Sequence, residues 1–487
     1  MAEPDLDSPA VSRVREFLRD RRRHAWLVGG TVRDLLLGKQ PCDVDLAIAD
    51  DPRPLARDFA DSVGGSFFTM SEEFRACRVV AQATATAGTG APAGSGAVTW
   101  DFVALRGASI EDDLRGRDFT VNAMAVELPV AGAVLDPLGG RADLAAGRLA
   151  AASGEIFDHD PLRLLRALRL EKELGLAIDE PLAGLIRDRA PLASRPAAER
   201  TFAELTRLLA APGACAAARR MDSLGLLEVL LPELTALKGI SQNDYHHLDV
   251  FEHTLANCTA LEQVIADPAA FFPGQARQLQ QRAHRRLAGD AGWSFMMAFA
   301  ALTHDIAKPF CRFIDVDGQV RFFEHDRRGG EMVAGILGRM KASAEITRAV
   351  AFLVRRHMRF EGLLQQRPPS NRARLRYLRA TAPLTPELIM LAVSDRLSVR
   401  GRLVTEADIE AHLALTREMM ELYFAGEEAG PPPRLVSGDE LMRELELAPG
   451  PLIGSLLARI EEEQRLGNLN SRDEALAAAA RMLKEEG

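Results

Sequence analysis

The chain has 487 residues, 47% of them hydrophobic and 26% charged, with a formal net charge of −9; this length exceeds what one hydrophobic core supports and predicts several globular domains. No apolar run reaches membrane-spanning length, and the opening MAEPDLDSPA lacks the basic and apolar regions of a signal peptide. The five cysteines are scattered, which indicates a reduced, cytoplasmic protein, and the acidic balance restricts any RNA contact to local basic patches.

The first chemically informative segment is WLVGGTVRDLLLGKQPCDVDLAIA, residues 26–49. It predicts an apolar strand that ends at Gly29-Gly30, a short amphipathic helix, and a second strand with Asp43 and Asp45. Side chains at i and i+2 of a strand point the same way, so these two carboxylates can together hold the Mg²⁺ of a nucleoside triphosphate. The glycine pair lets a phosphate approach the helix N-terminus. This arrangement favours a nucleotidyltransferase.

Two later segments carry further polar groups. Asp101 interrupts the apolar strand VTWDFVALR, where it either faces a metal or partner, or lies solvent-facing on an edge strand. In RGRDFTVNAMAVE, Arg117, Asp118 and Asn122 offer a cation, an acceptor and an amide to a sugar and phosphates. A turn with Asp118 as the N-cap of a following helix explains the same residues, and both explanations can hold at once.

Composition divides the chain further. Residues 82–97 are uncharged and rich in Ala, Gly and Thr, which predicts a flexible hairpin insert. From about residue 151 the chain is mostly helical, and the leucine spacing in DPLRLLRALRLEKELGL predicts a helix that stops at Gly175. The segment AGEEAGPPPR predicts a linker before a last helical segment. We expect four parts: 1–150, 151–235, 236–424 and 425–487.

Six segments resemble, in order, the motifs of one enzyme family: GGTVRD, DVDLA, EDDLRGRDFTVNAMA, DPLGGRADL, FDHDPLRLLRALRL and RPAAERTFAEL. They are similar to head and neck motifs of the bacterial tRNA nucleotidyltransferase and poly(A) polymerase family, within the polymerase-β superfamily. The resemblance implies an α/β head with a small mixed sheet, followed by a mostly helical neck, body and tail. It also implies roles for eight head residues: Asp43 and Asp45 for Mg²⁺, Gly29, Gly30 and Arg33 for the triphosphate, and Arg117, Asp118 and Asn122 for the nucleotide's sugar and phosphates.

Base selection in this family belongs to an Asp and an Arg three residues apart, at positions that are Asp160 and Arg163 here. Residues i and i+3 share a helix face, and a carboxylate beside a guanidinium offers an acceptor and donors to a base edge. Asp160 followed by Pro161 is also a good N-cap with proline at N1, so capping alone explains the pair equally well.

The turn after the strand of Asp101 is short. Only four residues separate Arg106 from Glu111, whereas the family usually has a long loop there, thought to help switch the pocket from C to A. Relatives with a shortened loop resemble CC-adding enzymes. The insert at 82–97 lies on the other side of Asp101 and either replaces that loop or does not. Whether the enzyme adds only CC or the full CCA therefore stays open.

A second group of residues lies in the C-terminal half. Histidine and aspartate recur at separated helical positions, and imidazole with carboxylate suits a divalent transition metal. The pattern resembles the HD phosphohydrolase superfamily. That resemblance implies one set of metal ligands, His253, His304, Asp305 and Asp395, and two additional positions of two-metal members, His325 and His357. Such a site can activate water against a phosphoester; the alternative is a degenerate HD fold that only supports tRNA.

The densest basic stretches are candidates for contacts with the RNA backbone, or else solvated faces. They contain Arg282, Arg285 and Arg286, then Arg355, Arg356 and Arg359, then Arg372, Arg374, Arg376 and Arg379.

The expected activity is addition of C (CC, or full CCA) from CTP and ATP to the 3′ end of tRNA, with Mg²⁺ and release of pyrophosphate. The alternatives are a poly(A) polymerase, an HD phosphohydrolase with an inactive head, and a non-catalytic tRNA-binding protein.

Overall fold

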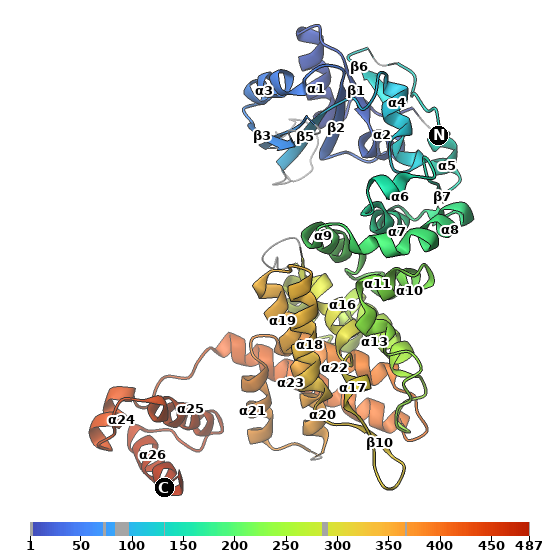
Figure 1. Ribbon diagram of the computed structural model, residues 1–487. Coiled ribbons are helices and arrows are strands. Elements are labelled where there is room, and N and C mark those ends of the chain that lie inside the picture. The colour runs from blue at the N-terminus through green and yellow to red at the C-terminus, as the bar shows by residue number, and fades with distance from the viewer. Residues whose placement is uncertain are drawn as a thin grey trace. The chain divides into compact units, whose positions relative to one another are not determined.

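The protein folds as two compact units in this computed structural model, which describes residues 3–71, 75–82, 97–130, 132–284, 291–365 and 368–486 (Figure 1). The first unit contains Met1–Glu204 and Ser223–Leu230, and the second contains Leu205–Asp222 and Leu231–Gly487. The first holds an α/β head and part of a helical neck. The second is almost entirely helical.

A six-stranded mixed sheet forms the head, with strand order β3-β4-β5-β2-β1-β6. Only β2 and β5 run parallel among these neighbours. The strands are β1 (Ala25–Val28), β2 (Asp43–Ile48), β3 (Ser66–Ser71), β4 (Ala76–Gln82), β5 (Ala97–Ala104) and β6 (Ala125–Leu128). The strands β4 and β5 pair antiparallel up to Gln82 and Ala97, so the insert at 82–97 does connect a hairpin. Residues 83–96 of that insert lie outside the described residues.

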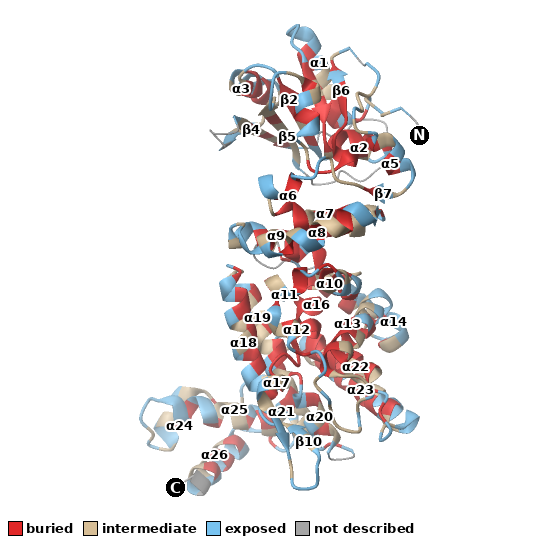
Figure 2. Ribbon diagram, turned by 45° about the vertical axis from the view of Figure 1, so that its right-hand side comes forward, coloured by how far each residue is buried: buried red, intermediate tan, exposed pale blue. Residues whose placement is uncertain are grey.

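One face of this sheet packs against helices α1 (Pro9–Asp20) and α3 (Pro52–Val63). The ring of Phe59 contacts Trp100 and Phe102 of β5, with ring centroids 5.1 and 5.6 Å apart. Trp100 and Phe102 are fully buried, and Figure 2 shows buried segments in the middle of the head. Because strand side chains alternate, the carboxylates of β2 and β5 point to the opposite face.

On that opposite face lie α2 (Gly30–Leu36) and α4 (Ile110–Arg115). The expected strand, turn and helix around the glycine pair are therefore confirmed. In place of the helix expected after Asp118, a single 3-10 turn forms over Thr120–Asn122, and its N-cap Phe119 has no side-chain cap. The N-cap explanation of Asp118 is wrong, because its carboxylate accepts from Phe119 N and Asn122 Nδ2 instead.

The helices that follow the head start with α5 (Gly140–Ala145), α6 (Ile156–His159) and α7 (Arg163–Leu174). The expected stop at Gly175 is confirmed, since this residue caps α7 with φ +65°. The remaining elements of this region are β7 (Arg148–Leu149), β8 (Ala177–Ile178), α8 (Glu180–Arg189), η2 (Ala190–Ser194), α9 (Ala198–Leu208), α10 (Ala214–Ser223), α11 (Leu226–Leu230) and α12 (Pro232–Thr235).

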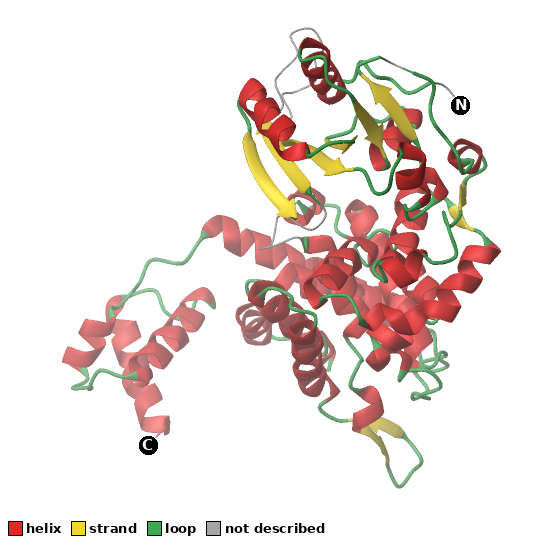
Figure 3. Ribbon diagram, turned by 45° about the horizontal axis from the view of Figure 1, so that its top comes forward, coloured by secondary structure: helices red, strands yellow, loops and turns green. Residues whose placement is uncertain are grey.

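The second unit is built around α16 (Trp293–Thr303), whose side chains are buried along nearly its whole length. Packed around it are α13 (Val250–Ala266), α19 (Ala344–Arg356) and α22 (Thr385–Ser398), while α18 (His325–Arg339) packs on α19 and α23 (Glu406–Ala429) on α22. Smaller elements complete this body: α14 (Pro268–Phe271), α15 (Ala276–Ala283), α17 (Lys308–Cys311), β9 (Arg312–Ile314), β10 (Val320–Phe322), α20 (Arg359–Leu364) and α21 (Asn371–Thr381). Figure 3 shows the β9–β10 hairpin as a small sheet among helices.

A three-helix tail ends the chain, with its own core around Leu441, Leu456 and Ala479. Its helices are α24 (Gly438–Glu444), α25 (Pro451–Arg465) and α26 (Arg472–Glu486). The predicted linker is shorter than expected, because α23 continues through Ala429 and ends at Gly430, where φ is +68°. Four of the five residues in AGEEA are good helix formers, so α23 runs on through Gly426 and stops only at Gly430 and the prolines beyond.

Candidate functional site

The head carboxylates lie side by side on adjacent strands. Asp45 of β2 and Asp101 of β5 are register partners, and Asp43 is paired with Thr99 and hydrogen-bonded to its hydroxyl. Since β5 lies between β4 and β2, the edge-strand explanation of Asp101 is wrong. Arg78 of β4 donates to both oxygens of Asp101 at 2.8 and 2.7 Å. One sheet face thus gathers three carboxylates, one of which is paired with Arg78.

Asp45 is the carboxylate most affected by this environment. Burial raises its pKa to about 6, with Asp101 and Asp43 acting in the same direction, while Arg117 and Arg33 oppose them. Its backbone N–H donates to Thr31 Oγ1 at 2.7 Å, which ties the strand to the start of α2. Carboxylates crowded on one sheet face have the chemistry that a divalent cation needs, because the cation removes their repulsion. Asp43 and Asp45 therefore fit Mg²⁺.

The glycine turn brings its backbone close to Arg117. Gly29 has φ +66°, and a Cβ there would lie 2.7 Å from Arg117 Nη1, so a side chain would strain the backbone and displace the Arg117 guanidinium. The guanidinium of Arg117 is held by Asp113, which is 3% exposed and accepts from Nε at 2.9 Å and Nη2 at 2.8 Å. Asp113 also accepts from the backbone N–H of Arg106 at 3.2 Å. This buried carboxylate joins the short turn to the arginine beside the glycines.

A chain of hydrogen bonds links the other polar residues of the head. Arg33 Nη1 donates to Asn122 Oδ1 at 2.6 Å, and Asn122 Nδ2 donates to Asp118 Oδ1 at 3.0 Å. Arg166 of α7 lies 3.3 Å from Asp118 Oδ2. Burial alone would raise the pKa of Asp118, but Arg166 and the hydrogen bonds from Asn122 and Phe119 N lower it, so this carboxylate is charged.

A cavity of about 190 Å³ opens between these groups, and its charged lining residues are Asp45, Arg106, Asp113, Arg117, Asp118, Arg163 and Arg166. Asp160 and Arg163, the pair proposed for base selection, do not both line this cavity. Arg163 lines the cavity and donates to the carbonyls of Gly116 and Ile156, each at 3.4 Å. Asp160 is not among the lining residues and pairs with Arg200 at 3.1 Å. Asp160 is also not the N-cap of α7, which is Leu162, although its carboxylate accepts from Leu162 N at 3.2 Å.

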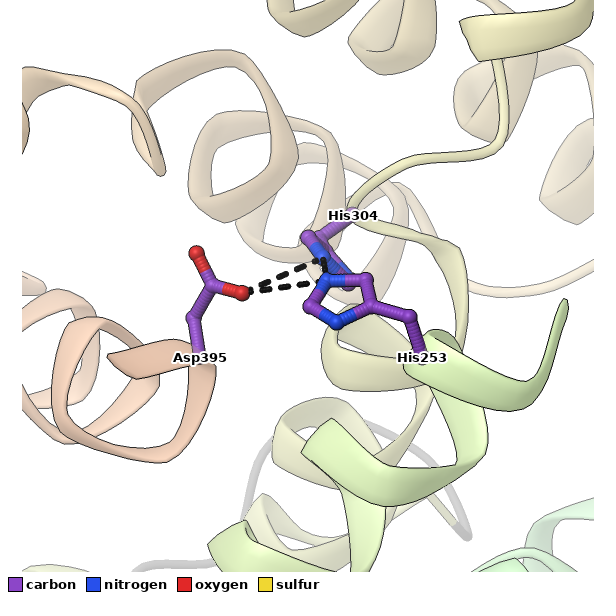
Figure 4. Close-up of side chains that lie close together, drawn as sticks. All are labelled: His253, His304 and Asp395. Atoms are coloured by element: carbon purple, nitrogen blue, oxygen red, sulfur yellow. Dashed lines mark hydrogen bonds and ion pairs between the residues drawn. The ribbon is translucent and has the colours of Figure 1, made fainter. Parts of the chain in front are cut away.

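The six histidines and aspartates of the second unit come together from five helices and their ends. They form two groups: His253, His304 and Asp395, and Asp305, His325 and His357. In Figure 4, Asp395 reaches from α22 toward the rings of His253 and His304, with Oδ1 to Nε2 distances of 3.2 and 3.8 Å. Asp305 connects the groups, because Oδ2 lies 3.1 Å from His304 Nε2 and Oδ1 lies 3.3 Å from His325 Nε2.

The hydrogen bonds of the rings fix which nitrogen faces the centre. Three of the rings place Nδ1 at 2.7–2.8 Å from a backbone carbonyl, and they are His304, His325 and His357. His253 Nδ1 lies 3.2 Å from Ser398 Oγ, whose own proton goes to the Asp395 carbonyl. Each Nδ1 is therefore the donor, and the Nε2 atoms converge on the centre.

Two pairs of these Nε2 atoms lie only 3.3 Å apart, His253 with His304 and His325 with His357. Although burial lowers the pKa of His253, Asp305 and Asp395 raise it, so a proton on this ring offsets the crowding and a metal cation can take the place of that proton. Burial, with His325 and His304 adding to it, lowers the pKa of His357 to about 4, so this ring is neutral and able to bind a metal. The donor set of imidazole and carboxylate fits a divalent transition metal.

Lys308 is a member of this site that the sequence analysis missed. Its Nζ lies 2.6 Å from Asp305 Oδ2 and donates to Gln242 Oε1 at 2.6 Å. Although burial raises the pKa of Asp305, His304 and Lys308 hold it well below its usual range. The spacing of Lys308 one helical turn after Asp305 was the available signal.

Most of the basic stretches are engaged within the protein. Arg282 is buried and donates to both oxygens of Glu387 at 3.0 Å, so its candidate role in RNA contact is wrong. Arg374 pairs with Glu418 at 2.7 Å. Arg372, Arg376 and Arg379 surround Glu462 of α25 at 3.7, 3.3 and 2.5 Å. Arg285 and Arg286 lie outside the described residues.

Comparison with protein families matches the head and the helices after it to two separate family models. Residues 25–150 match the family model of the poly A polymerase head domain, and residues 175–238 match that of the probable RNA and SrmB-binding site of polymerase A. An A-adding tRNA nucleotidyltransferase of Deinococcus radiodurans is 36% identical over 95% of this chain and 96% of its own. A CC-adding tRNA nucleotidyltransferase of Thermus thermophilus is 33% identical over 93% of each.

The chain belongs to the tRNA nucleotidyltransferase and poly(A) polymerase family. Solved structures of this family share the fold. A CCA-adding enzyme with CTP matches at a TM-score of 0.62 and 19% identity, covering 98% of this chain and 96% of that one. The Thermotoga maritima CCA-adding enzyme complexed with tRNA matches at 0.59 and 20% identity, covering 97% and 94%. The predicted polymerase-β-type head with a mostly helical body is therefore confirmed. None of the described helices is long and apolar enough to cross a membrane.

Proposed function

We propose that this protein extends the 3′ end of tRNA by nucleotidyl transfer from CTP, with Mg²⁺ and with release of pyrophosphate. The observation that carries this proposal is the gathering of Asp43, Asp45 and Asp101 on one sheet face, next to a cavity lined by arginines. Membership of the family and the presence of tRNA-, CTP- and ATP-bound enzymes among similar structures support it.

In this proposal Asp43 and Asp45 hold the metal ions. Bound Mg²⁺ supplies a lower pKa for the attacking 3′ hydroxyl and stabilisation of the charge on the triphosphate. Arg117 Nη1 is fixed beside Gly29, where the missing side chain lets the guanidinium approach the glycine turn and present a charge to a phosphate. Arg33 acts by holding Asn122, and Arg163 presents its donors to the cavity.

For the number of nucleotides added, we propose CC. The supporting observation is the short turn between β5 and α4, which ends at Ser109, the N-cap of α4, whose side chain accepts from Asp112 N. The carboxylate of Asp113 further fixes this turn through Arg106 N. A turn bound at both ends has little freedom to reshape the pocket for a second base. Addition of A alone is the second candidate, because the Deinococcus radiodurans relative carries that name.

The test uses purified protein, Mg²⁺, and tRNA transcripts that end before CCA, at C, or at CC, with CTP, ATP or both. Sequenced 3′ ends that stop at CC support the proposal, and A added only to the CC transcript supports the second candidate. Complete CCA ends would show that the short turn does not limit the enzyme. Long A-runs on varied RNA would identify a poly(A) polymerase.

Two variants separate catalysis from folding in the same assay. Asp43→Asn should abolish extension, and the matched control Asp50→Asn, whose side chain is 77% exposed, should leave it intact. Extension by Asp43→Asn at the wild-type rate would contradict the nucleotidyltransferase assignment of this face.

We also propose an HD-type metal centre with phosphohydrolase activity in the second unit, supported by the convergence of four Nε2 atoms and two carboxylates. Its residues would hold a divalent transition metal, which supplies an activated water when bound. Release of phosphate from a 2′,3′-cyclic or terminal phosphoester should be lost in His304→Ala and kept in Asp43→Asn. Absence of hydrolysis in wild-type protein loaded with Mn²⁺ or Ni²⁺ would contradict this proposal and favour an HD fold that only supports tRNA.

A further inference from the structure

A second cavity, of about 350 Å³, lies in the second unit between α20 and α21, and none of the clustered histidines lines it. Three of its lining residues are arginines, Arg359, Arg372 and Arg376, and none is acidic. The hydroxyl-bearing residues Ser370 and Tyr377 complete its polar lining. A hollow with this composition suits an anion rather than a cation or an apolar ligand.

The charges around the cavity are unevenly compensated. Arg372 and Arg376 face Glu462 of α25 at 3.7 and 3.3 Å, and Arg372 also pairs with Glu463. Arg359 is exposed and has no ion pair within the described part of the chain. Arg355 and Arg356 are close to Arg359 in the sequence and add to the positive potential. The pKa of Arg356 is lowered by burial and by the nearby charges of Arg359 and Arg355. One cation at the cavity therefore lacks a counterion.

The other polar groups can donate to an anion. Ser370 is the N-cap of α21, where its Oγ accepts from Ala373 N at 3.2 Å, so its own proton stays available. The eleven-residue helix places its positive dipole end there. Tyr377 is 5% exposed and packs edge-on against Phe360, and burial keeps its phenol protonated by raising its pKa far above the usual value.

We propose that this cavity binds a phosphate group, with Arg359 as its principal counterion and Ser370 and the N-terminus of α21 as further donors. The phosphate belongs either to the backbone of an RNA or to a free anion. Arg372 and Arg376 take part while they remain paired to Glu462, so the bound phosphate lies next to the junction between α21 and the tail helix α25. This inference does not depend on the proposed catalytic activities.

The test compares full-length wild type with Arg359→Gln, Arg359→Lys and the control Arg277→Gln, which removes an exposed arginine of α15 elsewhere in the same unit. Two probes are used: a tRNA transcript lacking CCA, titrated at several salt concentrations, and inorganic phosphate, titrated by calorimetry. For an RNA phosphate, Arg359→Gln should weaken tRNA binding by about three- to tenfold and lower the salt-dependence slope by about 1. Arg359→Lys should restore much of the affinity.

The outcomes separate the two sources. Weaker tRNA binding with a smaller slope in Arg359→Gln, and not in Arg277→Gln, identifies an RNA backbone phosphate. Unchanged tRNA binding with loss of inorganic phosphate binding identifies a free anion. If both probes bind Arg359→Gln and wild type alike, or if Arg277→Gln loses as much affinity as Arg359→Gln, the proposal is overturned. Arg359 is exposed, so an unchanged unfolding midpoint is expected and confirms that the variant is folded.

Discussion

At the scale of single residues, Asp45 links the geometry of the head to a measurable pH dependence. A carboxyl whose pKa is about 6 binds a proton below that pH when no metal is present. Because the proton competes with Mg²⁺, apparent Mg²⁺ affinity should fall about tenfold for each pH unit below 6 and level off above it. Extension rates measured from pH 5 to 8 at limiting Mg²⁺ test this. Excess Mg²⁺ should move the midpoint to lower pH, and a midpoint independent of Mg²⁺ would contradict the assignment.

Asp113 is expected to act by positioning Arg117. Asp113→Asn keeps the shape of the side chain but removes the negative charge. In the wild type, the Asp113 carboxylate holds the Arg117 guanidinium and accepts from Arg106 N. We expect KM for CTP to rise by about tenfold, with a smaller fall in kcat, since an ion pair of a buried carboxylate is worth about 1.5–3 kcal/mol.

The matched control for Asp113→Asn is Asp112→Asn, whose side chain is 47% exposed in the same helix turn. A purely structural role of Asp113 would lower the unfolding midpoint without changing the ratio of KM to kcat.

Residue identities in the sites were partly predictable. The spacing of Asp43 and Asp45 fixes their shared face once a strand is assumed, and the structure bears out that geometry. Arg78 and Asp113 could not be found, because their partners depend on strand order and on a turn whose path the sequence does not state. Asp160 and Arg163 share a helix face in principle, but Arg200 takes the Asp160 carboxylate. A competing arginine 40 residues away leaves no trace in local spacing.

At the scale of elements, the contact between α21 and α25 is centred on the carboxylate of Glu462, and Glu463 adds a second ion pair to Arg372. Glu462 is 8% exposed and is approached by Arg372, Arg376 and Arg379. Glu462→Gln should lower the free energy of unfolding by about 1–3 kcal/mol, because three arginines lose their shared partner. Chemical denaturation measures this.

The neighbouring residue Glu461 provides the control for that prediction. Its side chain is 50% exposed and pairs only with Arg465 one helical turn away among the described residues. Glu461→Gln should change stability by less than about 0.5 kcal/mol. Equal effects of the two substitutions would show that the α21–α25 contact adds nothing to stability.

Periodicity located elements better than it located their ends. The strand–turn–helix start of the head and the stop of α7 at Gly175 follow from local chemistry. The start of the linker shows the limit of predicting element ends from sequence. The segment AGEEA is compatible with a helix or a loop, and the packing of the preceding turns of α23 on α22 decides that it is helical. Similarly, a capping pattern after Asp118 gave only a 3-10 turn, because the carboxylate is taken up by Asn122 and Phe119 N.

At the scale of the whole molecule, the two compact units should respond differently to metals. Binding to the folded state raises stability in proportion to the logarithm of ligand concentration over Kd, by about 2.7 kcal/mol at a hundredfold excess. Mn²⁺ should therefore raise the unfolding transition of the second unit, and His304→Ala should remove that shift. Calorimetric scans with and without chelator measure it, with Asp43→Asn as the control that keeps the shift. An equal shift in both variants would contradict metal binding at the histidines.

Family membership and the mixed-sheet head with a helical body were predictable from the order of the motifs, because each motif marks a turn or strand end of the head. The convergence of six residues from 253 to 395 was predictable only by resemblance. No rule of spacing brings α13, α16, α18, α19 and α22 to one point; their buried apolar faces do so.

The position of Asp305 has a consequence for how that centre fills. Its two oxygens face different groups, Oδ2 toward His253 and His304 and Oδ1 toward His325 and His357. A carboxylate shared in this way gives its negative charge to whichever ion arrives first. The second ion then meets a weaker field and the repulsion of a neighbour across one carboxylate bridge. If both groups hold a metal, their occupancy would be linked in this way, and a stepwise titration should give a tight first binding constant and a distinctly weaker second one.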